Sequence, residues 1–277
     1  MKKWFKFIGI LLIVLMVAAA CGNNESTEQP SDKAETQTPA QTPTETKEEV
    51  ELTISAAASL KDAMDVIQKN YQEKHPETTL QFNFGASGSL QQQISQGAPA
   101  DLFFSAAEDK FDLLVKEGAI AAEDGIDLLG NSIVLVVPKG DSSIQSIEDL
   151  AKAEVGQISI GTPETVPAGK YAQESLENMG IWKEVESKIV FAKDVRQVLS
   201  YVETGNVEAG MVYKTDAAVS DKVDIVASAD TSTHTPIIYP VGIIKDSKYY
   251  EAAKQFYEYL QSDEAIKVFE EYGFTAQ

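Results

Sequence analysis

The 277-residue sequence contains few of the residues on which several classes of protein depend: it has one cysteine, one arginine and two histidines. A lone cysteine cannot form an intrachain disulfide. One arginine in a chain with a net charge of −20 at pH 7 leaves no basic cluster for a nucleic-acid partner. The histidines, His75 and His234, stand in no spacing typical of metal ligands. We therefore expect no disulfide, no nucleic-acid partner, no metal cation and no cofactor.

The sequence also lacks an apolar run long enough for a membrane-spanning helix. An uncharged apolar run extends from Phe7 to Ala20, whereas about 20 apolar residues are needed to span a bilayer. Three lysines within the first six residues precede this run, and three alanines end it. This pattern is typical of an export signal, so we expect residues 1–20 to be a signal peptide.

Cys21 directly follows the three alanines. Its position resembles the lipobox of bacterial lipoproteins, in which the cysteine is diacylated and becomes the mature N-terminus, although Ala18 stands where that motif usually has leucine. The alternative is ordinary signal-peptide cleavage that leaves a free thiol. Both interpretations export the protein, and the first predicts a lipid anchor at the outer face of the cytoplasmic membrane.

Residues 21–49 differ sharply in composition from the rest of the chain. From Gly22 to Glu49 there is no aromatic or large aliphatic side chain, and Ser, Thr, Gln, Pro, Glu and Lys predominate. Such a segment buries too little apolar surface to offset the entropy of ordering. We expect a disordered stalk that begins at the lipidated cysteine.

The remaining chain alternates short apolar strands with amphipathic helices. Strand, helix, strand, helix and strand are expected in turn from Leu52 to Phe104, and the alternation restarts at Ser132, as in doubly wound sheets. A long extended run, Ile237 to Ile244, would carry the chain back, so that the helical stretch from Tyr249 to Glu271 packs on the first part. We therefore expect an α/β fold of two lobes, each a doubly wound and mostly parallel sheet, joined by two extended hinge crossings. Lobe 1 is expected at 50–131 and 243–277, and lobe 2 at 132–242.

In five places a short apolar strand leads through small or hydroxyl residues into a helix. These places are Ala56–Leu60, Gly85–Ser89, Val166–Gly169, Lys193–Arg196 and Met211–Lys214. Backbone N–H groups at the start of a helix have no acceptor within it, and the helix dipole favours an anion there. Because ligands of open α/β sheets bind beyond the carboxyl ends of the strands, the five junctions are expected to converge on a small oxyanion.

Longer motifs recur in a fixed order along the folded part of the chain. They are Ala56–Leu60, Gly97–Phe103, Leu129–Ser132, Pro163–Ala172, Glu208–Ala217 and Tyr272–Thr275. In this order they resemble the periplasmic molybdate-binding proteins of bacterial ABC importers, and the resemblance extends from about Leu52 to Thr275. It implies the two-lobed periplasmic-binding-protein (Venus-flytrap) fold closing on molybdate or tungstate, with a membrane permease and its ATPase as partners. We further expect a monomer.

The resemblance also implies the ligand contacts. They fall on Ser59, Ser87, Ala168, Val195 and Tyr213. Gly88 departs from the family, whose second turn is usually richer in serine.

These five residues can offer hydroxyl and backbone N–H donors but no ionised carboxylate. A monoprotonated oxyanion such as hydrogenphosphate needs an acceptor for its own hydrogen. A fully deprotonated dianion fits the donors better, which leaves molybdate, tungstate and, as the alternative, sulfate. Asp101 and Asp194 are expected to be structural, because a carboxylate facing a dianion would repel it.

A hydrolase with a serine nucleophile is a remote alternative. The segment from Gly85 to Ser89 superficially resembles a nucleophile elbow, but the G-x-S-x-G pattern fails at Ser89 and no histidine is placed to serve it. Cys21 lies outside the expected fold and supplies no nucleophile. We therefore expect a binding protein and not an enzyme.

Overall fold

The computed structural model describes residues 49–277. The expected signal peptide over 1–20, Cys21 and all but the last residue of the expected stalk over 21–49 lie outside these residues. Among the helices of residues 49–277, none is both long and apolar enough to cross a membrane.

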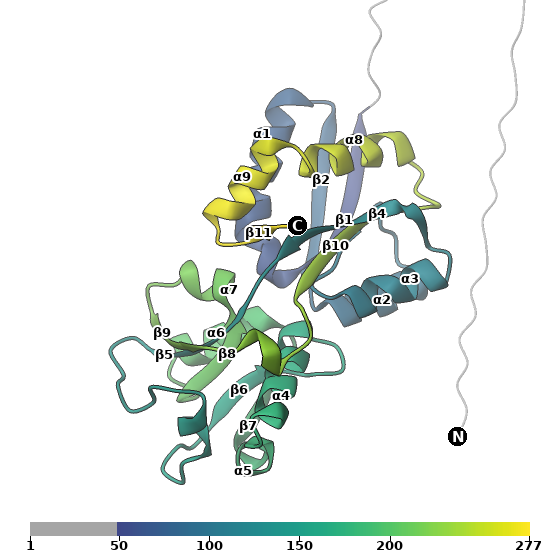
Figure 1. Ribbon diagram of the computed structural model, residues 1–277. Helices are drawn as coiled ribbons and strands as arrows, with labels where there is room; N and C mark the ends of the chain where they lie inside the picture. The colour runs from purple at the N-terminus through teal and green to yellow at the C-terminus, as the bar shows by residue number, and fades with distance from the viewer. Residues whose placement is uncertain (1–48) are drawn as a thin grey trace, which may run out of the picture. The chain divides into compact units, whose positions relative to one another are not determined.

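The strands of this part of the chain form two sheets (Figure 1). The first has the strand order β11-β4-β10-β3-β1-β2 and the second has the order β7-β6-β8-β5-β9. Strands of the first sheet are β1 (Val50–Ala57), β2 (Thr78–Gly85), β3 (Leu102–Phe104), β4 (Ile120–Gly130), β10 (Ile238–Ile244) and β11 (Thr275–Ala276). Strands of the second sheet are β5 (Ile133–Pro138), β6 (Ile158–Gly161), β7 (Ile189–Ala192), β8 (Ala209–Tyr213) and β9 (Val223–Ser228).

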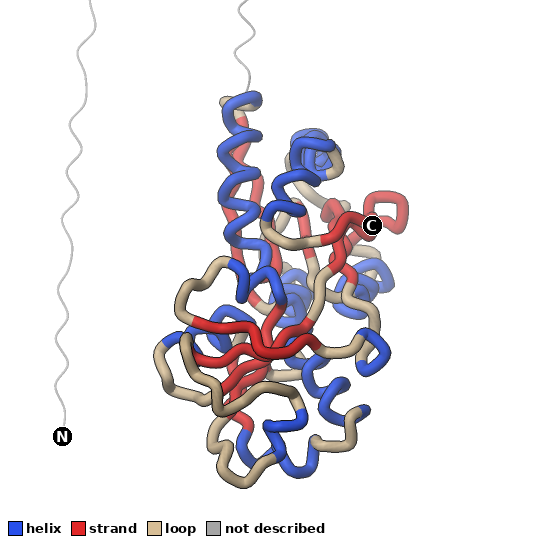
Figure 2. Tube along the Cα trace, turned by 60° about the vertical axis from the view of Figure 1, so that its left-hand side comes forward, coloured by secondary structure: helices blue, strands red, loops and turns tan. Residues whose placement is uncertain are grey.

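Helices accompany each sheet, as Figure 2 shows by colour. With the first sheet lie α1 (Lys61–Lys74), α2 (Ser87–Ser95), α3 (Glu108–Lys116), α8 (Tyr250–Leu260) and α9 (Asp263–Glu271). With the second lie α4 (Pro167–Asn178), α5 (Trp182–Val185), α6 (Val195–Glu203) and α7 (Lys214–Ala218). Short 3-10 helices are η1 (Ala58–Leu60), η2 (Glu148–Ala151), η3 (Glu186–Lys188) and η4 (Thr231–Thr233). We call each sheet with its helices a lobe.

Helices cover both faces of the first sheet. Successive side chains of a strand point to opposite faces, so neighbouring residues of β3 pack against different helices. Leu102 and Phe104 of β3 belong to the large hydrophobic cluster that includes Phe256 of α8 and residues of α1 and α9. Phe103, between them, belongs to a second cluster with residues of α2 and α3, among them Phe111. A strand buried on both faces reads as a continuous apolar run, which is why Leu102-Phe103-Phe104 could be recognised in the sequence.

The expected α/β fold of two lobes is confirmed, and most strands of each sheet run in one direction, with antiparallel strands inserted among them. β2, β1 and β3 are parallel to one another, as are β7, β6 and β8. β10 is antiparallel to β3 and β4, and β5 is antiparallel to β8 and β9. Apolar runs predict strands but not their direction, and the chain enters each sheet in reverse when it crosses from the other lobe.

Two segments connect the lobes. Residues 131–132 join β4 to β5, and residues 229–237 join β9 to β10. The expected limits of the lobes remain a proposal: residues 50–131 and 243–277 for lobe 1, and residues 132–242 for lobe 2. Because β10 pairs with β3 and β4, we propose to place the second limit before Ile238 instead of after residue 242.

Helix α4 lies unusually close to strand β6, which positions the start of this helix. A Cβ atom on Gly169 would come within 1.9 Å of the carbonyl oxygen of Gly161. Backbone atoms at that distance cannot move aside as a flexible side chain can. Only hydrogen fits at residue 169, so the glycine sets the distance between helix and strand.

We expect Gly169→Ala to lower the free energy of unfolding by about 3 kcal/mol, at the upper end of the cost of overpacking a core. Gly85→Ala is the matched control, because its Cβ would meet only the end of the Leu90 side chain at 3.4 Å. Urea unfolding of both variants measures the difference. Equal stability of the two variants would show that α4 can shift away from β6 without cost.

Candidate ligand-binding site

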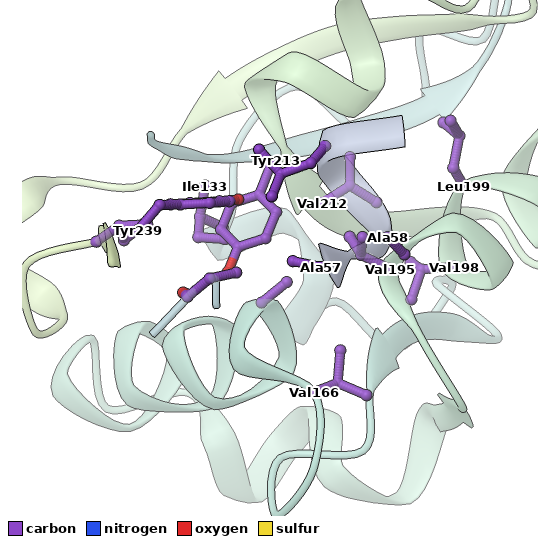
Figure 3. Close-up of a cluster of buried hydrophobic side chains, with 14 of the residues drawn as sticks. Ala57, Ala58, Ile133, Val166, Val195, Val198, Leu199, Val212, Tyr213 and Tyr239 are labelled. Carbon is purple, nitrogen blue, oxygen red and sulfur yellow. The ribbon is translucent and has the colours of Figure 1, made fainter. Parts of the chain in front are cut away.

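A small cavity lies between the two lobes at the strand-to-helix junctions. From lobe 1 it is lined by Ala57, Ala58, Ser59, Gly85, Ala86, Ser87 and Ala106. From lobe 2 it is lined by Val166, Pro167, Ala168, Val195 and Tyr213. Figure 3 shows Ala57, Ala58, Val195 and Tyr213 brought together from different elements. The cavity volume is about 10 Å³, roughly the room that one water molecule requires, so the site suits a compact group and not an extended organic solute.

All five residues that the sequence predicts as ligand contacts line this cavity. Ser59 lies in η1, Ser87 is the first residue of α2 and Ala168 is the second residue of α4. Val195 is the first residue of α6, and Tyr213 ends β8. Each is buried. The structure therefore brings together, from both lobes, residues that are up to 154 positions apart in the numbering of the chain.

The helices that begin at the cavity leave backbone donors facing it. Neither α2 nor α4 has a side chain that caps its N-terminus, because the capping positions are Ala86 and Val166. Proline at the first position of α4 supplies no N–H, so the donors of that helix begin with Ala168. The first N–H groups of a helix have no intrahelical acceptor. The N–H of Gly88 donates to Thr165 and that of Gly169 to Val166, so a bound anion would cap the groups that remain, among them the N–H groups of Ser87 and Ala168.

Helix α6 is capped differently. Its N-cap Asp194 accepts a hydrogen bond from the backbone N–H of Gln197 at 2.8 Å. The expected structural role of Asp194 is thus confirmed. Asp101 is structural as well, because its carboxylate accepts from the backbone N–H of Thr53 at 2.7 Å and from the Ser247 hydroxyl at 2.5 Å.

Three hydroxyl groups add to the backbone donors. Ser87 Oγ accepts a hydrogen bond from the backbone N–H of Ala106 at 2.9 Å, which leaves its own hydrogen available to the cavity. Ser59 Oγ lies 3.0 Å from the hydroxyl of Tyr239. The hydroxyl of Tyr213 makes a long hydrogen bond, 3.4 Å, to the carbonyl of Ala106 and also contacts the hydroxyl of Tyr239. Burial raises the pKa of Tyr213 well above its ordinary value, so its hydroxyl keeps its hydrogen and can donate.

No residue that lines the cavity has a charged side chain. An anion here would be held by hydrogen-bond donors and helix dipoles, without an ion pair. A larger depression of about 650 Å³ lies elsewhere, between the start of β1 and α8, and is lined by residues such as His75 and Tyr249. No strand-to-helix junctions converge on that depression, so we regard the small cavity as the site.

The two lobes touch directly beside the cavity through Gly88. Its backbone N–H donates to the carbonyl of Thr165 at 2.9 Å, and a Cβ on Gly88 would come within 2.8 Å of Thr165 backbone atoms. The sequence shows Gly88 only as a departure from the family pattern. The structure gives it a reason: a serine or alanine here would hold the two lobes apart.

A group of charged residues joins the lobes behind the cavity. Arg196, next to Val195, forms ion pairs with Asp62 of α1 and, through Nε at 2.7 Å, with the fully buried Asp216 of α7. Burial opposes the charge of Arg196, but Asp216 and Asp62 outweigh it and raise its pKa. Sequence analysis missed this role, although Arg196 is the one arginine of the chain and lies inside a predicted junction.

The structure offers no base for a serine nucleophile in the described residues. The hydroxyls of Ser59 and Ser87 contact Tyr239 and Ala106, whereas His75 stacks on Tyr71 with ring centroids 4.3 Å apart and His234 contacts Thr235. Across residues 49–277 no three His, Cys, Asp or Glu side chains are grouped to hold a metal ion. The arrangement at the cavity is suited to binding a small anion.

Two lobes that enclose a small, uncharged and donor-rich cavity define a two-lobed solute-binding protein. Comparison with known proteins identifies the family: the chain belongs to the bacterial extracellular solute-binding proteins, which match residues 52–275.

Relatives of the chain cover most or all of it. The chain is 57% identical over 277 residues, 100% of this chain and 99% of the relative, to YvgL of Bacillus subtilis, whose name gives it a proposed role as an ABC transporter substrate-binding lipoprotein. It is 38% identical over 232 residues, 82% of this chain and 90% of the relative, to the molybdate-binding protein ModA of Haemophilus influenzae. It also resembles the solved substrate-binding domain of a proposed molybdenum ABC transporter from Clostridium difficile, with a TM-score of 0.64 and 46% identity, over 82% of this chain and 98% of that one.

The buried carboxyl group of Asp216 gives the site a testable pH dependence. Burial raises the pKa of Asp216 to about 7, against the lowering effect of Arg196. Between about pH 4, the range of an unfolded aspartate, and pH 7 the folded chain then binds a proton that the unfolded chain does not. The free energy of unfolding should fall as pH rises through this window, by at most about 1.4 kcal/mol per pH unit.

Asp216→Asn should lack this dependence, so urea unfolding at pH 5 and pH 8 should show the variant gaining stability relative to the parent at the higher pH. Asp224→Asn is the control, because the hydrogen bond from Lys139 lowers the pKa of Asp224. Its carboxylate is ionised at both pH values, so this variant should keep the pH dependence of the parent. Parallel pH profiles of parent and Asp216→Asn would mean that the carboxylate stays ionised beside Arg196.

Proposed function

We propose that this solute-binding protein captures molybdate or tungstate and delivers it to an ABC transporter permease and its ATPase. The observation that carries the proposal is the convergence of strand-to-helix junctions from both lobes on one cavity without charged side chains. The names of the relatives ModA and the molybdenum transporter domain support the choice of anion. A receptor of this kind binds and releases its solute unchanged, so the proposal includes no catalysis and no resident cofactor.

The chemistry of the cavity supports a fully deprotonated oxyanion. We propose that Ser59 and Ser87 donate from their hydroxyl and backbone N–H groups, Ala168 and Val195 from their backbone N–H groups, and Tyr213 from its hydroxyl. The absence of a carboxylate among the lining residues leaves no strong acceptor for an anion that carries its own hydrogen. Molybdate and tungstate are fully deprotonated near neutral pH, whereas phosphate largely retains at least one hydrogen.

Sulfate is the alternative, because it is also a tetrahedral dianion without a hydrogen. The two candidates differ in size, and molybdate and tungstate are the larger anions. Calorimetric titration with molybdate, tungstate, sulfate and phosphate at matched ionic strength therefore separates them. We expect tight binding of the first two and weak or no binding of sulfate and phosphate. Preference for sulfate would keep the fold and the site but change the ligand.

The charge of the protein does not contradict this proposal. The net charge is −20 at pH 7, yet charges more than about 10 Å away are largely screened at physiological salt. The nearby positive charge of Arg196 is already paired with Asp62 and Asp216. Local dipoles therefore decide whether the cavity accepts an anion. The same negative charge supports the proposal that the protein has no nucleic-acid partner.

Ser59→Ala and Tyr213→Phe should each weaken molybdate binding by roughly 1–3 kcal/mol, the range for losing a hydrogen bond to a charged group. Both changes keep the shape of the site apart from one hydroxyl group. Titration calorimetry measures the loss, and thermal unfolding checks that each variant is folded. Tyr250→Phe is the control. It removes a hydroxyl that contacts Asp124, neither residue lines the cavity, and the variant should bind as the parent does. Parental affinity in both site variants would show that the ligand lies elsewhere.

We also propose that the exported protein is a monomer held at the outer face of the cytoplasmic membrane by a lipid on Cys21. The name of YvgL as a lipoprotein supports this location. Cys21→Ser should then release the protein from membranes into the medium, which fractionation and immunoblotting of expressing cells would show. Retention of Cys21→Ser on the membrane would rule out an anchor at this residue, and a Ser26→Ala variant controls for changes in export.

A further inference from the structure

A chain of buried and partly buried hydrogen bonds runs from the segments that connect the lobes to the cavity. Asn131 lies in the first connection, and Tyr239 lies at the start of β10, just after the second. Tyr239 is fully buried, and its ring packs edge-on against that of Tyr213 with centroids 5.6 Å apart. Figure 3 shows the two tyrosines side by side. Tyr239 does not line the cavity, but its hydroxyl contacts Ser59, which does.

The orientation of the Asn131 amide follows from its neighbours. The backbone N–H of Ser132 lies 2.8 Å from Oδ1 of Asn131, and an N–H group can only donate. The amide oxygen must therefore face Ser132, which fixes the NH2 group on the other side. Its two hydrogens are directed to Thr215 Oγ1 at 2.9 Å and to the Tyr239 hydroxyl at 3.1 Å.

The hydroxyl of Tyr239 has two further neighbours. Tyr239 Oη accepts from Asn131, and its own single hydrogen can go to Ser59 Oγ, 3.0 Å away, or to the hydroxyl of Tyr213. Burial raises the pKa of Tyr239 well above its ordinary value, so that hydrogen is retained. When Tyr239 donates its hydrogen to Ser59 Oγ, the hydrogen of Ser59 can be donated to the cavity.

Ser87 is directed in the same way by a different neighbour. Its Oγ accepts from the backbone N–H of Ala106 at 2.9 Å. With Tyr239 donating to Ser59, both serine oxygens accept hydrogen bonds from outside the cavity. The two hydroxyl groups then present hydrogens to a ligand, and neither is oriented to accept one.

We propose that Tyr239 and Asn131 are positioning residues that fix the direction of the Ser59 hydroxyl and thereby make the cavity selective for oxyanions without a hydrogen. The proposal deepens the proposed function and rests on it. With the chain Asn131 to Tyr239 to Ser59 intact, an anion such as hydrogenphosphate meets a donor where it needs an acceptor. Without the Tyr239 hydroxyl, Ser59 can rotate and accept the hydrogen of the anion.

The test compares the parent with Tyr239→Phe by titration with molybdate and with phosphate at pH 8, where phosphate is mainly hydrogenphosphate. Tyr239→Phe should weaken molybdate binding about three- to tenfold, the effect of one hydrogen bond. It should weaken hydrogenphosphate binding less or strengthen it, so that the ratio of the two affinities falls. Tyr71→Phe is the matched control: Tyr71 is also fully buried, and its hydroxyl has no hydrogen-bond partner among the described residues. That variant should leave the ratio within about twofold of the parent.

A double-mutant comparison shows whether Tyr239 acts through Ser59. In a Ser59→Ala background the Tyr239→Phe change should alter molybdate affinity less than about twofold, because the group that it positions is gone. An effect of full size in that background would overturn the proposal. Asn131→Ala removes the donor that orients Tyr239 and should shift the affinity ratio in the same direction, so it carries the test if Tyr239→Phe does not fold.

The outcomes separate the two proposals. A parent that binds molybdate, with an unchanged affinity ratio in Tyr239→Phe, would overturn the positioning role while leaving the proposed function intact. Equal weakening of both anions would also overturn it, because a purely structural role predicts that result. A parent that binds no molybdate would contradict the proposed function itself.

Discussion

Backbone N–H groups at the start of a helix have no acceptor within that helix, and most proteins satisfy them with a capping side chain. In this chain α2 and α4 begin with Ala86 and Val166 at the capping positions, and both helices begin at the same cavity. The close packing of Gly169 on Gly161 keeps α4 in place, and the contact of Gly88 with Thr165 brings α2 against it from the other lobe. The organisation of the site depends on these two helices, which have no capping side chain. Their backbone N–H groups are the primary donors, and the hydroxyl groups add to them.

A strongly acidic protein can hold an anion in this way because the charges are kept out of the cavity. Arg196 is adjacent to a lining residue, yet its guanidinium group is directed to Asp62 and Asp216 and joins the lobes. Alanine, glycine, serine, proline, valine and tyrosine line the cavity itself. Selectivity can then arise from the direction of each hydrogen bond and from size, which an ion pair would not provide. The five candidate contact residues are buried, and hydrogen bonds are stronger in such an environment.

The elements with strong periodicity could be predicted from the sequence, and those that depend on tertiary contacts could not. The buried face of α1 and the cap of α6 by Asp194 follow from local spacing and chemistry. Strand β4 was not predicted, because acidic residues and alanines interrupt its apolar pattern and only its last residues are continuously buried. The helical stretch expected from Tyr249 to Glu271 is divided into α8 and α9, since Ser262 caps a new helix. The junctions that hold the five candidate contacts have a local signature, and the resemblance to molybdate-binding proteins indicated which residue at each junction would contact the ligand. Asn131 and Tyr239 carry no such signature, and their contact with each other spans 108 positions in the sequence.

The central claim is that a molybdenum oxyanion is held where the junctions converge, and anomalous diffraction at the molybdenum absorption edge from crystals grown with molybdate tests it most directly. The account predicts one strong molybdenum peak inside the cavity, with oxyanion oxygens at hydrogen-bond distance from the hydroxyls of Ser59, Ser87 and Tyr213 and from the backbone N–H groups of Ala168 and Val195. A molybdenum peak outside the cavity, or a peak within it that lacks contacts to the starts of α2 and α4, would contradict the account.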